Sequence, residues 1–252
     1  MMILKFHYLC LLTRVLSIHT FTINHKYKYM KKLVYLLLFV STFSFSQNAF
    51  MEYQFQAKRG TESAILALMD NMWENAEFKS GGIDIESFDI GNVNSSHRII
   101  LYGDPANWGR KDSLSNDDKW SVFIQKLNNH VEKWTHSSSG NVMSWDGDNK
   151  AYNYVQIYEI KSSDPVALKT AHDKIVSEMS SNMKGEIGFG SYEIGGHNGS
   201  THWIAITAKN WSDLILTRRE MKKMTKLWES YYINRGDVEY VRNYTSKVVR
   251  RY

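Results

Sequence analysis

Two histidines occupy equivalent places in the sequence, and imidazole is the side chain best suited to proton transfer near neutral pH. His97 and His202 each begin an apolar, strand-like stretch shortly after a similar pentapeptide, Ser87–Gly91 in the first case and Ser191–Gly195 in the second. An imidazole at the edge of an apolar surface can carry a proton or bind haem iron or another metal. The same ring can instead cap its hairpin through hydrogen bonds to the backbone. Its presence in both places favours that structural role, because packing requirements are shared between repeats.

The residues around each pentapeptide predict a hairpin whose strands pair about the intervening turn. Asp89 and Glu193 hold equivalent positions, and two carboxylates that converge can perform acid and base catalysis. An ordinary surface ion pair explains Asp89 equally well, because the predicted register places it opposite an arginine. The predicted pairs are Ile90 with His97, Asp89 with Arg98, Ile194 with His202, and Glu193 with Trp203.

Metal binding has weak support in the sequence. His197 lies five residues before His202 in a glycine-rich turn, but no third ligand is adjacent, so no metal site is predicted. The segment Asp146–Asn149 resembles part of a calcium loop and lacks the remaining oxygen ligands, which makes an ordinary turn the better interpretation. His197 stays a candidate contact for an organic ligand.

Tryptophan is abundant, with eight residues in the chain, and aromatic rings stack on flat ligands such as sugars. Six of the eight are explained structurally by helical stripes or by the repeated Asn-Trp pair. Trp145 and Trp203 have no counterpart in the other repeat, and they are the candidate ligand-binding residues together with His197.

The two pentapeptides belong to a longer internal duplication. Upstream, Lys58, Ala64 and Asp70 correspond to Lys161, Ala167 and Asp173, and downstream two Asn-Trp pairs correspond. A repeat of this length indicates two similar domains rather than a solenoid, whose units are shorter. We predict repeat 1 at residues 47–150 and repeat 2 at residues 151–252.

Hydrophobic periodicity predicts the order β-α-β-β-α-β in each repeat. Repeat 1 is predicted to contain strands at 51–57, 83–90, 97–102 and 141–145, a helix from Thr61 to Gly81, and a second helix carrying Trp120 to Trp134. Repeat 2 is predicted to contain strands at 154–160, 187–194, 202–207 and 238–249, a helix that begins at 163–165, and a continuous final helix from 212 to 232.

This layout resembles the dimeric α/β barrel superfamily in its fused form. The predicted fold class is α+β, with two tandem ferredoxin-like (βαββαβ) units packed sheet to sheet as a fused pseudo-dimer. The resemblance rests on the element order and the repeat, and no motif of a particular family is matched. It implies two kinds of enzyme, a cofactor-independent oxygenase and a haem-dependent protein, with His97 or His202 as base or axial ligand.

The N-terminus predicts export. Met30-Lys31-Lys32 precedes a short apolar run and small residues before Gln47, as in a signal peptide at residues 30–46. Residues 1–29 are expected to be a non-native upstream extension. The sequence therefore favours a periplasmic or secreted protein, with no stable membrane insertion after cleavage.

Charge and cysteine content exclude several classes once residues 1–46 are set aside. Six of the 31 basic residues lie in that segment, so residues 47–252 carry 25 basic against 26 acidic residues, and no nucleic-acid footprint is expected. The single cysteine, Cys10, is also in the leader, which excludes disulfides and cysteine nucleophiles from the predicted mature protein.

From these observations we favour an exported module that binds a small hydrophobic ligand, or is structural, without catalysis and without a cofactor. The alternatives are the barrel-type enzyme, including a haem-dependent one, and a surface protein that binds glycans through Trp145 and Trp203. A monomer and a homodimer are both compatible with the sequence.

Overall fold

A computed structural model describes residues 48–252, apart from residues 92–93, 113–116, 148–150 and 181–182. Gln47–Tyr252 form one compact unit. The predicted extension at residues 1–29 and signal peptide at residues 30–46, including Cys10, lie outside the described residues. So do Asp148 and Asn149 of the acidic turn. No helix within the described ranges is long and apolar enough to cross a lipid bilayer.

The first half of the unit contains four strands and two α-helices in the order expected from the hydrophobic pattern. The elements are β1 (Ala49–Ala57), α2 (Glu62–Trp73), β2 (Gly82–Phe88), β3 (His97–Gly103), the short 3-10 helix η1 (Pro105–Asn107), α3 (Asp117–Asn128) and β4 (Val131–Asp146).

The second half repeats this order, with one helix split into two. Its elements are β5 (Tyr154–Ser162), α4 (Pro165–Met179), β6 (Ile187–Ile194), the 3-10 helix η3 (His197–Gly199), β7 (His202–Ala208), α5 (Trp211–Lys223), α6 (Thr225–Asn234) and β8 (Val238–Arg251).

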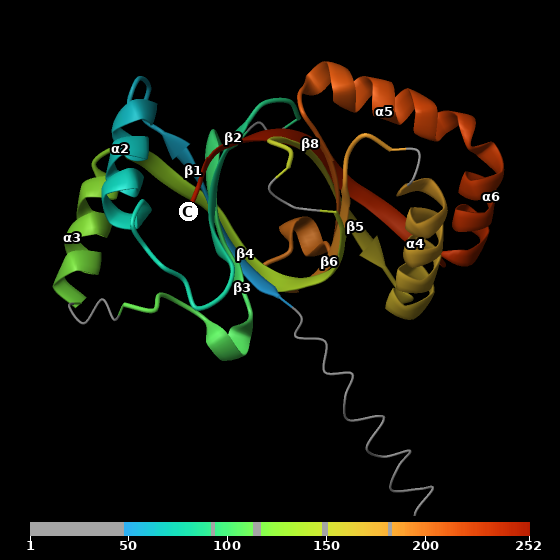
Figure 1. The fold of residues 1–252 in the computed structure, drawn as a ribbon, viewed down its shortest axis with the longest axis horizontal. Helices are drawn as coiled ribbons and strands as arrows, with labels where there is room; N and C mark the ends of the chain where they lie inside the picture. The colour runs from blue at the N-terminus through green and yellow to red at the C-terminus, as the bar shows by residue number, and fades with distance from the viewer. Residues whose placement is uncertain (1–47, 92–93, 113–116, 148–150, 181–182) are drawn as a thin grey trace, which may run out of the picture. The chain divides into compact units, whose positions relative to one another are not determined.

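The eight strands form one closed antiparallel barrel in the order β1-β3-β2-β8-β5-β7-β6-β4. Helices α2 and α3 lie on one side of the barrel, and α4, α5 and α6 lie on the other (Figure 1). The α+β class and the ferredoxin-like barrel expected from the sequence are therefore confirmed. The predicted packing of two separate sheets is modified, because β2 pairs with β8 and β4 pairs with β6, so the edges of the two halves are joined. Edge closure leaves no unpaired strand in the wall.

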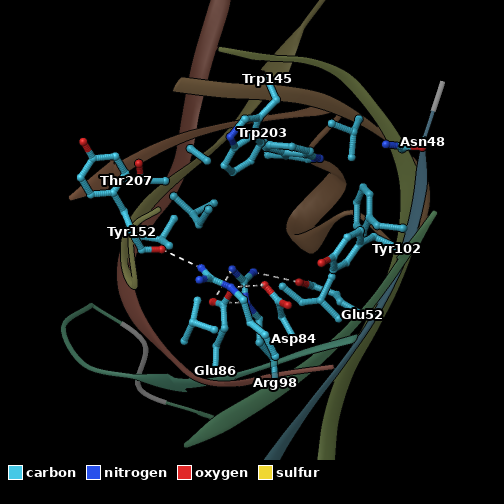
Figure 2. A pocket seen from close by; sticks show the side chains of 18 of the residues that line it. Asn48, Glu52, Asp84, Glu86, Arg98, Tyr102, Trp145, Tyr152, Trp203 and Thr207 are labelled. Carbon is cyan, nitrogen blue, oxygen red and sulfur yellow. Dashed lines mark hydrogen bonds and ion pairs between the residues drawn. The ribbon is translucent and has the colours of Figure 1, made fainter. Parts of the chain in front are cut away.

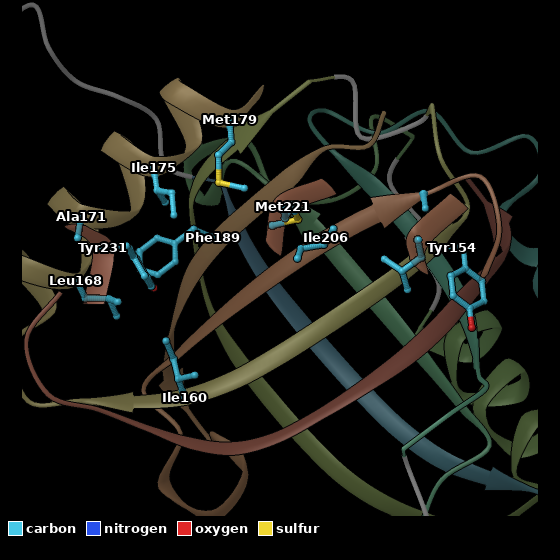
Figure 3. Packing of buried hydrophobic residues seen from close by; sticks show 12 residues of the cluster. Tyr154, Ile160, Leu168, Ala171, Ile175, Met179, Phe189, Ile206, Met221 and Tyr231 are labelled. Atoms are coloured by element: carbon cyan, nitrogen blue, oxygen red, sulfur yellow. The ribbon is translucent and has the colours of Figure 1, made fainter. Parts of the chain in front are cut away.

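Three apolar clusters stabilise this arrangement. One lies between α2, α3 and the first half of the wall, and includes Phe55, Ile85 and Leu127. A second lies beneath α4, α5 and α6, where Leu168, Ile175 and Met179 of α4 approach the strands (Figure 3). The third fills part of the barrel interior around Phe50, Ile157, Trp203 and Tyr244.

The predicted hairpin register is wrong by three residues in both halves. His97 pairs with Ser87, and His202 pairs with Ser191. The cause is competition from the neighbouring strands. The Ile90 carbonyl accepts the Thr245 backbone N–H of β8, and the Ile90 N–H donates to Thr245 Oγ1. Ile194 pairs with Ser139 of β4. Both isoleucines therefore pair with a neighbouring strand instead of within their hairpins.

This shift replaces the partners predicted for the two carboxylates. Arg98 lies opposite Glu86 instead of Asp89, and Trp203 lies opposite Gly190 instead of Glu193. Asp89 accepts a hydrogen bond from the Tyr154 hydroxyl at 2.7 Å, and Glu193 accepts one from the Asn141 amide at 3.0 Å. The two carboxylates therefore have different structural partners.

Trp134 belongs to a strand, which corrects the helix predicted through it. Helix α3 ends at Asn128, and the 16-residue strand β4 includes both Trp134 and the predicted short strand at 141–145. The Trp134 ring packs on Phe55 at 5.3 Å between centroids, and its Nε1 donates to Asn128 Oδ1 at 2.9 Å. Its spacing from the helical stripe was therefore coincidental, because pairing with β1 decides the local structure.

The final helix, predicted to be continuous, breaks at Met224, whose backbone (φ −84°, ψ 54°) is not helical. Trp228 Nε1 donates to the Met221 carbonyl at 2.7 Å and fixes the corner. The break turns α6 back against α4. It also brings Trp228, Tyr231 and Tyr232 to line one cavity between the helices and the barrel wall.

Candidate functional site

A cavity of about 540 Å³ lies between the second half of the barrel wall and helices α4, α5 and α6. We call it the helix–sheet pocket. Its volume lies within the usual range for small-molecule sites. Most of the residues that line it are apolar or aromatic, and the lining also includes four ionisable side chains other than tyrosine. The lining includes Ile175, Val176, Met179, Ile187, Ile204, Ile206, Met221, Tyr158, Trp228, Tyr231, Tyr232, Tyr240, His172, Arg218, Lys222 and Glu229.

Helix α4 supplies the only imidazole among the described residues that line this pocket. The helix begins at Pro165, where a proline is tolerated, and Asp164 Oδ1 accepts the Ala167 backbone N–H at 2.9 Å. Its buried stripe consists of Leu168, Ala171, His172, Ile175 and Met179. A histidine within an otherwise apolar stripe therefore faces the sheet.

His172 is 3% exposed, and its ring stacks on Phe189 of β6 with centroids 4.5 Å apart. Its Nε2 is buried and has no hydrogen-bond partner in the described part of the chain. Burial lowers the pKa of His172 to about 4, so the ring is neutral at pH 7. A neutral imidazole with an unengaged nitrogen beside a cavity can coordinate a metal centre or exchange a proton with a ligand.

Cationic and tyrosine side chains complete the pocket. Arg218 and Lys222 lie one turn apart on α5, with Arg218 half-buried and Lys222 exposed. Burial raises the pKa of Tyr231 to about 12, so its hydroxyl stays protonated and can donate. The Arg235 guanidinium lies 4.6 Å from the centre of the Tyr232 ring and 5.5 Å from that of Tyr240, which holds the aromatic rim together.

His172 was not among the residues selected from the sequence. In the alignment that matches Asp70 with Asp173, it corresponds to Met69, which is 1% exposed beneath α2. One signal was available: a single histidine on the apolar stripe of a predicted helix, absent from the other repeat. That signal is weak, because a histidine on such a stripe is usually a packed core residue.

His97 and His202 lie in pseudo-equivalent packed positions. Their rings stack on Phe55 and Phe189 at 5.6 and 5.5 Å, and burial lowers the pKa of both. His97 Nδ1 lies 2.9 Å from the Ser96 hydroxyl, and the corresponding contact of His202 is 2.8 Å from the Thr201 hydroxyl. Neither histidine lines the helix–sheet pocket or the cavity inside the barrel.

The structure brings Trp145 and Trp203 together inside the barrel, where both line a second cavity (Figure 2). Two glycines of β6 make room for them. A Cβ on Gly190 would lie 2.3 Å from the Trp203 ring, and one on Gly188 would lie 2.4 Å from the Trp145 ring. Trp203 is 8% exposed, so it does not form part of an outer surface on which a glycan could stack.

His197 lies apart from both cavities, in η3. Its ring contacts that of His136 at 5.5 Å in an edge-on arrangement. Burial and the charge of Arg242 lower the pKa of His197. Across the ranges that the structure describes, no cluster of three or more potential metal ligands is present.

The fold is similar to that of several solved structures, in agreement with the dimeric α/β barrel fold expected from the sequence. A monooxygenase-like protein from Fusobacterium nucleatum aligns with a TM-score of 0.54 and 13% identity over 82% of this chain and 94% of that one. A second, from Lactobacillus acidophilus, aligns with a TM-score of 0.53 and 10% identity over 81% and 94%. An anthrone oxidase-like protein aligns with a TM-score of 0.51 and 6% identity over 83% and 94%. No family model matches the sequence, and no curated relative is detected.

These similarities correct the function favoured from the sequence. The expectation of a non-catalytic binding or structural module is wrong, because the solved structures with this fold are monooxygenase-like and anthrone oxidase-like proteins. The expectation of no cofactor also loses its basis, since the helix–sheet pocket contains an unengaged imidazole. At these identities the likeness establishes the fold alone, so the activity is argued from the pocket.

Proposed function

We propose that this protein is an oxidoreductase that binds haem in the helix–sheet pocket, where His172 would hold the iron. The proposal rests on the imidazole of His172, which is neutral at pH 7 and lines a cavity of about 540 Å³. Its buried Nε2 has no hydrogen-bond partner among the described residues. Proteins hold haem iron most often through a neutral imidazole. A base with a pKa of about 4 is poorly matched to proton abstraction at pH 7, so coordination is the better use of this ring.

The remaining lining fits the same group. Apolar side chains from α4 and the barrel wall match the faces of a porphyrin, and Arg218 and Lys222 offer positive charge to its two carboxylates. Bound haem would supply a redox-active iron for reactions with dioxygen or peroxide. The chain would exclude water through Met179, Ile204 and Met221, and Phe189 would fix the plane of the His172 ring.

Haem titration tests this proposal directly. The wild-type protein should give a Soret band on reconstitution, and His172→Ala should weaken haem binding by about a hundredfold, because the imidazole that would hold the iron is lost. His202→Ala is the matched control, since His202 stacks on the same phenylalanine without lining the pocket. A wild-type protein without a Soret band, or a His202→Ala variant that loses the band while His172→Ala keeps it, would refute the assignment.

A cofactor-independent oxygenase is the second candidate, supported by the same neutral imidazole and by the tyrosine-rich wall of the pocket. A phenolic or enolic substrate would donate a hydrogen bond to the neutral His172 Nε2, which would orient the substrate for reaction with dioxygen. Oxygen uptake by metal-free protein with an anthrone, abolished in His172→Ala, would support this candidate over haem.

We also propose that the two halves derive from one duplicated ferredoxin-like unit. The proposal is supported by the equivalent pairs His97 with Ser87 and His202 with Ser191, and by the matched stacking of each histidine on a phenylalanine.

Export to the periplasm or beyond the cell is proposed from the N-terminal sequence. If residues 30–46 are a signal peptide, the protein recovered from the periplasm of a Gram-negative host should begin at Gln47. Intact-mass measurement gives the answer, with a gene that begins at Met30 as the control that should yield the same product. Recovery of uncleaved chain in the cytoplasm alone would contradict the proposal.

A further inference from the structure

The barrel interior encloses a second cavity, of about 170 Å³, which we call the barrel cavity. It is too small for haem or a drug-sized molecule and large enough for several waters or one small ligand. Asn48, which is exposed, lines the cavity and marks its opening to solvent. The lining is strongly two-sided: Trp145 and Trp203 lie on one side, and a group of charged side chains lies opposite them (Figure 2).

Two of the three carboxylates on the charged side, those of Glu52 and Glu86, form ion pairs with Arg98. Glu52 accepts hydrogen bonds from Arg98 at 2.9 Å, from Gln54 at 2.8 Å and from Ser138 at 3.1 Å. Glu86 accepts from Arg98 Nη2 at 2.7 Å, from Arg98 Nε at 2.9 Å and from the Ser246 hydroxyl. These side chains form a structural network centred on Arg98.

Two buried polar atoms in the lining lack a hydrogen-bond partner among the described residues. The Oδ1 atom of Asp84 is buried without a hydrogen-bond partner, while its Oδ2 faces Arg251 Nε at 3.5 Å. Trp203 Nε1 is also buried and unpartnered, and the residue is more than nine-tenths buried. A buried acceptor and a buried donor that both lack partners are costly, unless water or a ligand supplies the missing bonds.

The charge of the lining indicates what kind of ligand would fit. Three carboxylates, those of Glu52, Asp84 and Glu86, face two guanidinium groups, those of Arg98 and Arg251. One negative charge therefore lacks a counter-ion within the lining, and Asp84 carries the buried oxygen that has no hydrogen-bond partner among the described residues. An ammonium group would supply both the missing charge and the missing hydrogen bond. The aromatic side opposite suits a ring attached to that ammonium group.

We propose that the barrel cavity binds a small aromatic amine, with its ammonium group at Asp84 and its ring against Trp145 and Trp203. A hydroxyl or carbonyl oxygen on the ring accepts the Trp203 Nε1 hydrogen. This site is separate from the helix–sheet pocket and does not depend on haem. Gly188 and Gly190 of β6, which make room for the indole rings, correspond to Asp84 and Glu86 of β2 in the first half. The equivalent strands of the two halves therefore supply the charged side and the aromatic side of the cavity.

Calorimetric titration with tyramine and phenethylamine tests the proposal. Asp84→Asn should weaken both amines by about tenfold or more, because the charge partner is lost. Trp203→Phe keeps an aromatic ring and removes the N–H, so it should weaken tyramine about tenfold more than it weakens phenethylamine, which lacks the hydroxyl. Trp120→Phe on the outer face of α3 is the matched control and should leave both affinities unchanged.

The alternatives give different results. Equal affinity for 3-(4-hydroxyphenyl)propionate, which carries a carboxylate in place of the amine, would overturn the charge assignment. Unchanged tyramine binding in both Asp84→Asn and Trp203→Phe would place the ligand elsewhere and overturn the site. An absence of heat with either amine at about millimolar concentration would mean that the barrel cavity holds water only. His172→Ala should leave amine binding intact, so failure of the haem proposal would not be confused with failure of this one.

Discussion

Replacing Arg98 with methionine should destabilise the protein by about 3–5 kcal/mol, the range expected when one partner of a buried ion pair is removed. The Arg98 side chain is 6% exposed, and its partners Glu52 and Glu86 are 3% and 5% exposed. Its guanidinium also donates to the Tyr244 hydroxyl at 3.0 Å. Methionine fills much of the same volume but leaves two buried carboxylates without a cation.

Chemical denaturation at pH 7 measures this loss, and a compensated variant isolates its cause. Adding Glu52→Gln and Glu86→Gln to Arg98→Met removes the stranded charges and should recover most of the stability. Arg242→Met is a useful comparison, because that arginine, 18% exposed, pairs with the single carboxylate of Glu159. A loss below about 1 kcal/mol for Arg98→Met, or no recovery in the triple variant, would show that the network contributes little.

The second large effect concerns Asp84 and pH. Burial, followed by the negative charge of Glu86, raises the pKa of Asp84 from 3.8 to about 6. The charges of Arg251 and Arg98 oppose that rise. The folded protein therefore holds this proton more tightly than the unfolded chain does. The resulting destabilisation is absent below pH 4 and complete above pH 6, so Asp84 lowers the free energy of unfolding as pH rises through this window.

The expected size is about 3 kcal/mol, from a pKa difference of roughly two units at 1.36 kcal/mol each. Asp84→Asn should remove this contribution, so the variant should be more stable than wild type at pH 7 and nearly equal to it at pH 4. Denaturant unfolding at several pH values measures the difference, with Asp237→Asn at an exposed position as the control. Tyr102, whose pKa is raised to about 12 by burial and by Asp84, stays protonated throughout. A pH-independent difference between Asp84→Asn and wild type would contradict the assignment.

The barrel and the helix–sheet pocket differ in how far local sequence determines them. The element order followed from hydrophobic periodicity, because alternation and helical stripes report directly which face of an element is buried. The prediction failed at Trp134 and at the hairpin register, where a competing strand decides the outcome. Ile90 and Ile194 could pair within their hairpins or across to β8 and β4, and no local signal distinguishes the two.

The functional residues show the same division. Trp145 and Trp203 were selected because the other repeat lacks them, and the structure brings them into one cavity. His172 could not be selected from the sequence, because its candidacy as a ligand-binding residue depends on an Nε2 without a hydrogen-bond partner and on the α5–α6 corner that covers the pocket. The element order and the α+β class could be predicted from the sequence, since these depend on contacts close along the chain. The register, the barrel closure and the two cavities required the three-dimensional structure, because each depends on strands and helices distant in the sequence that compete for the same partners.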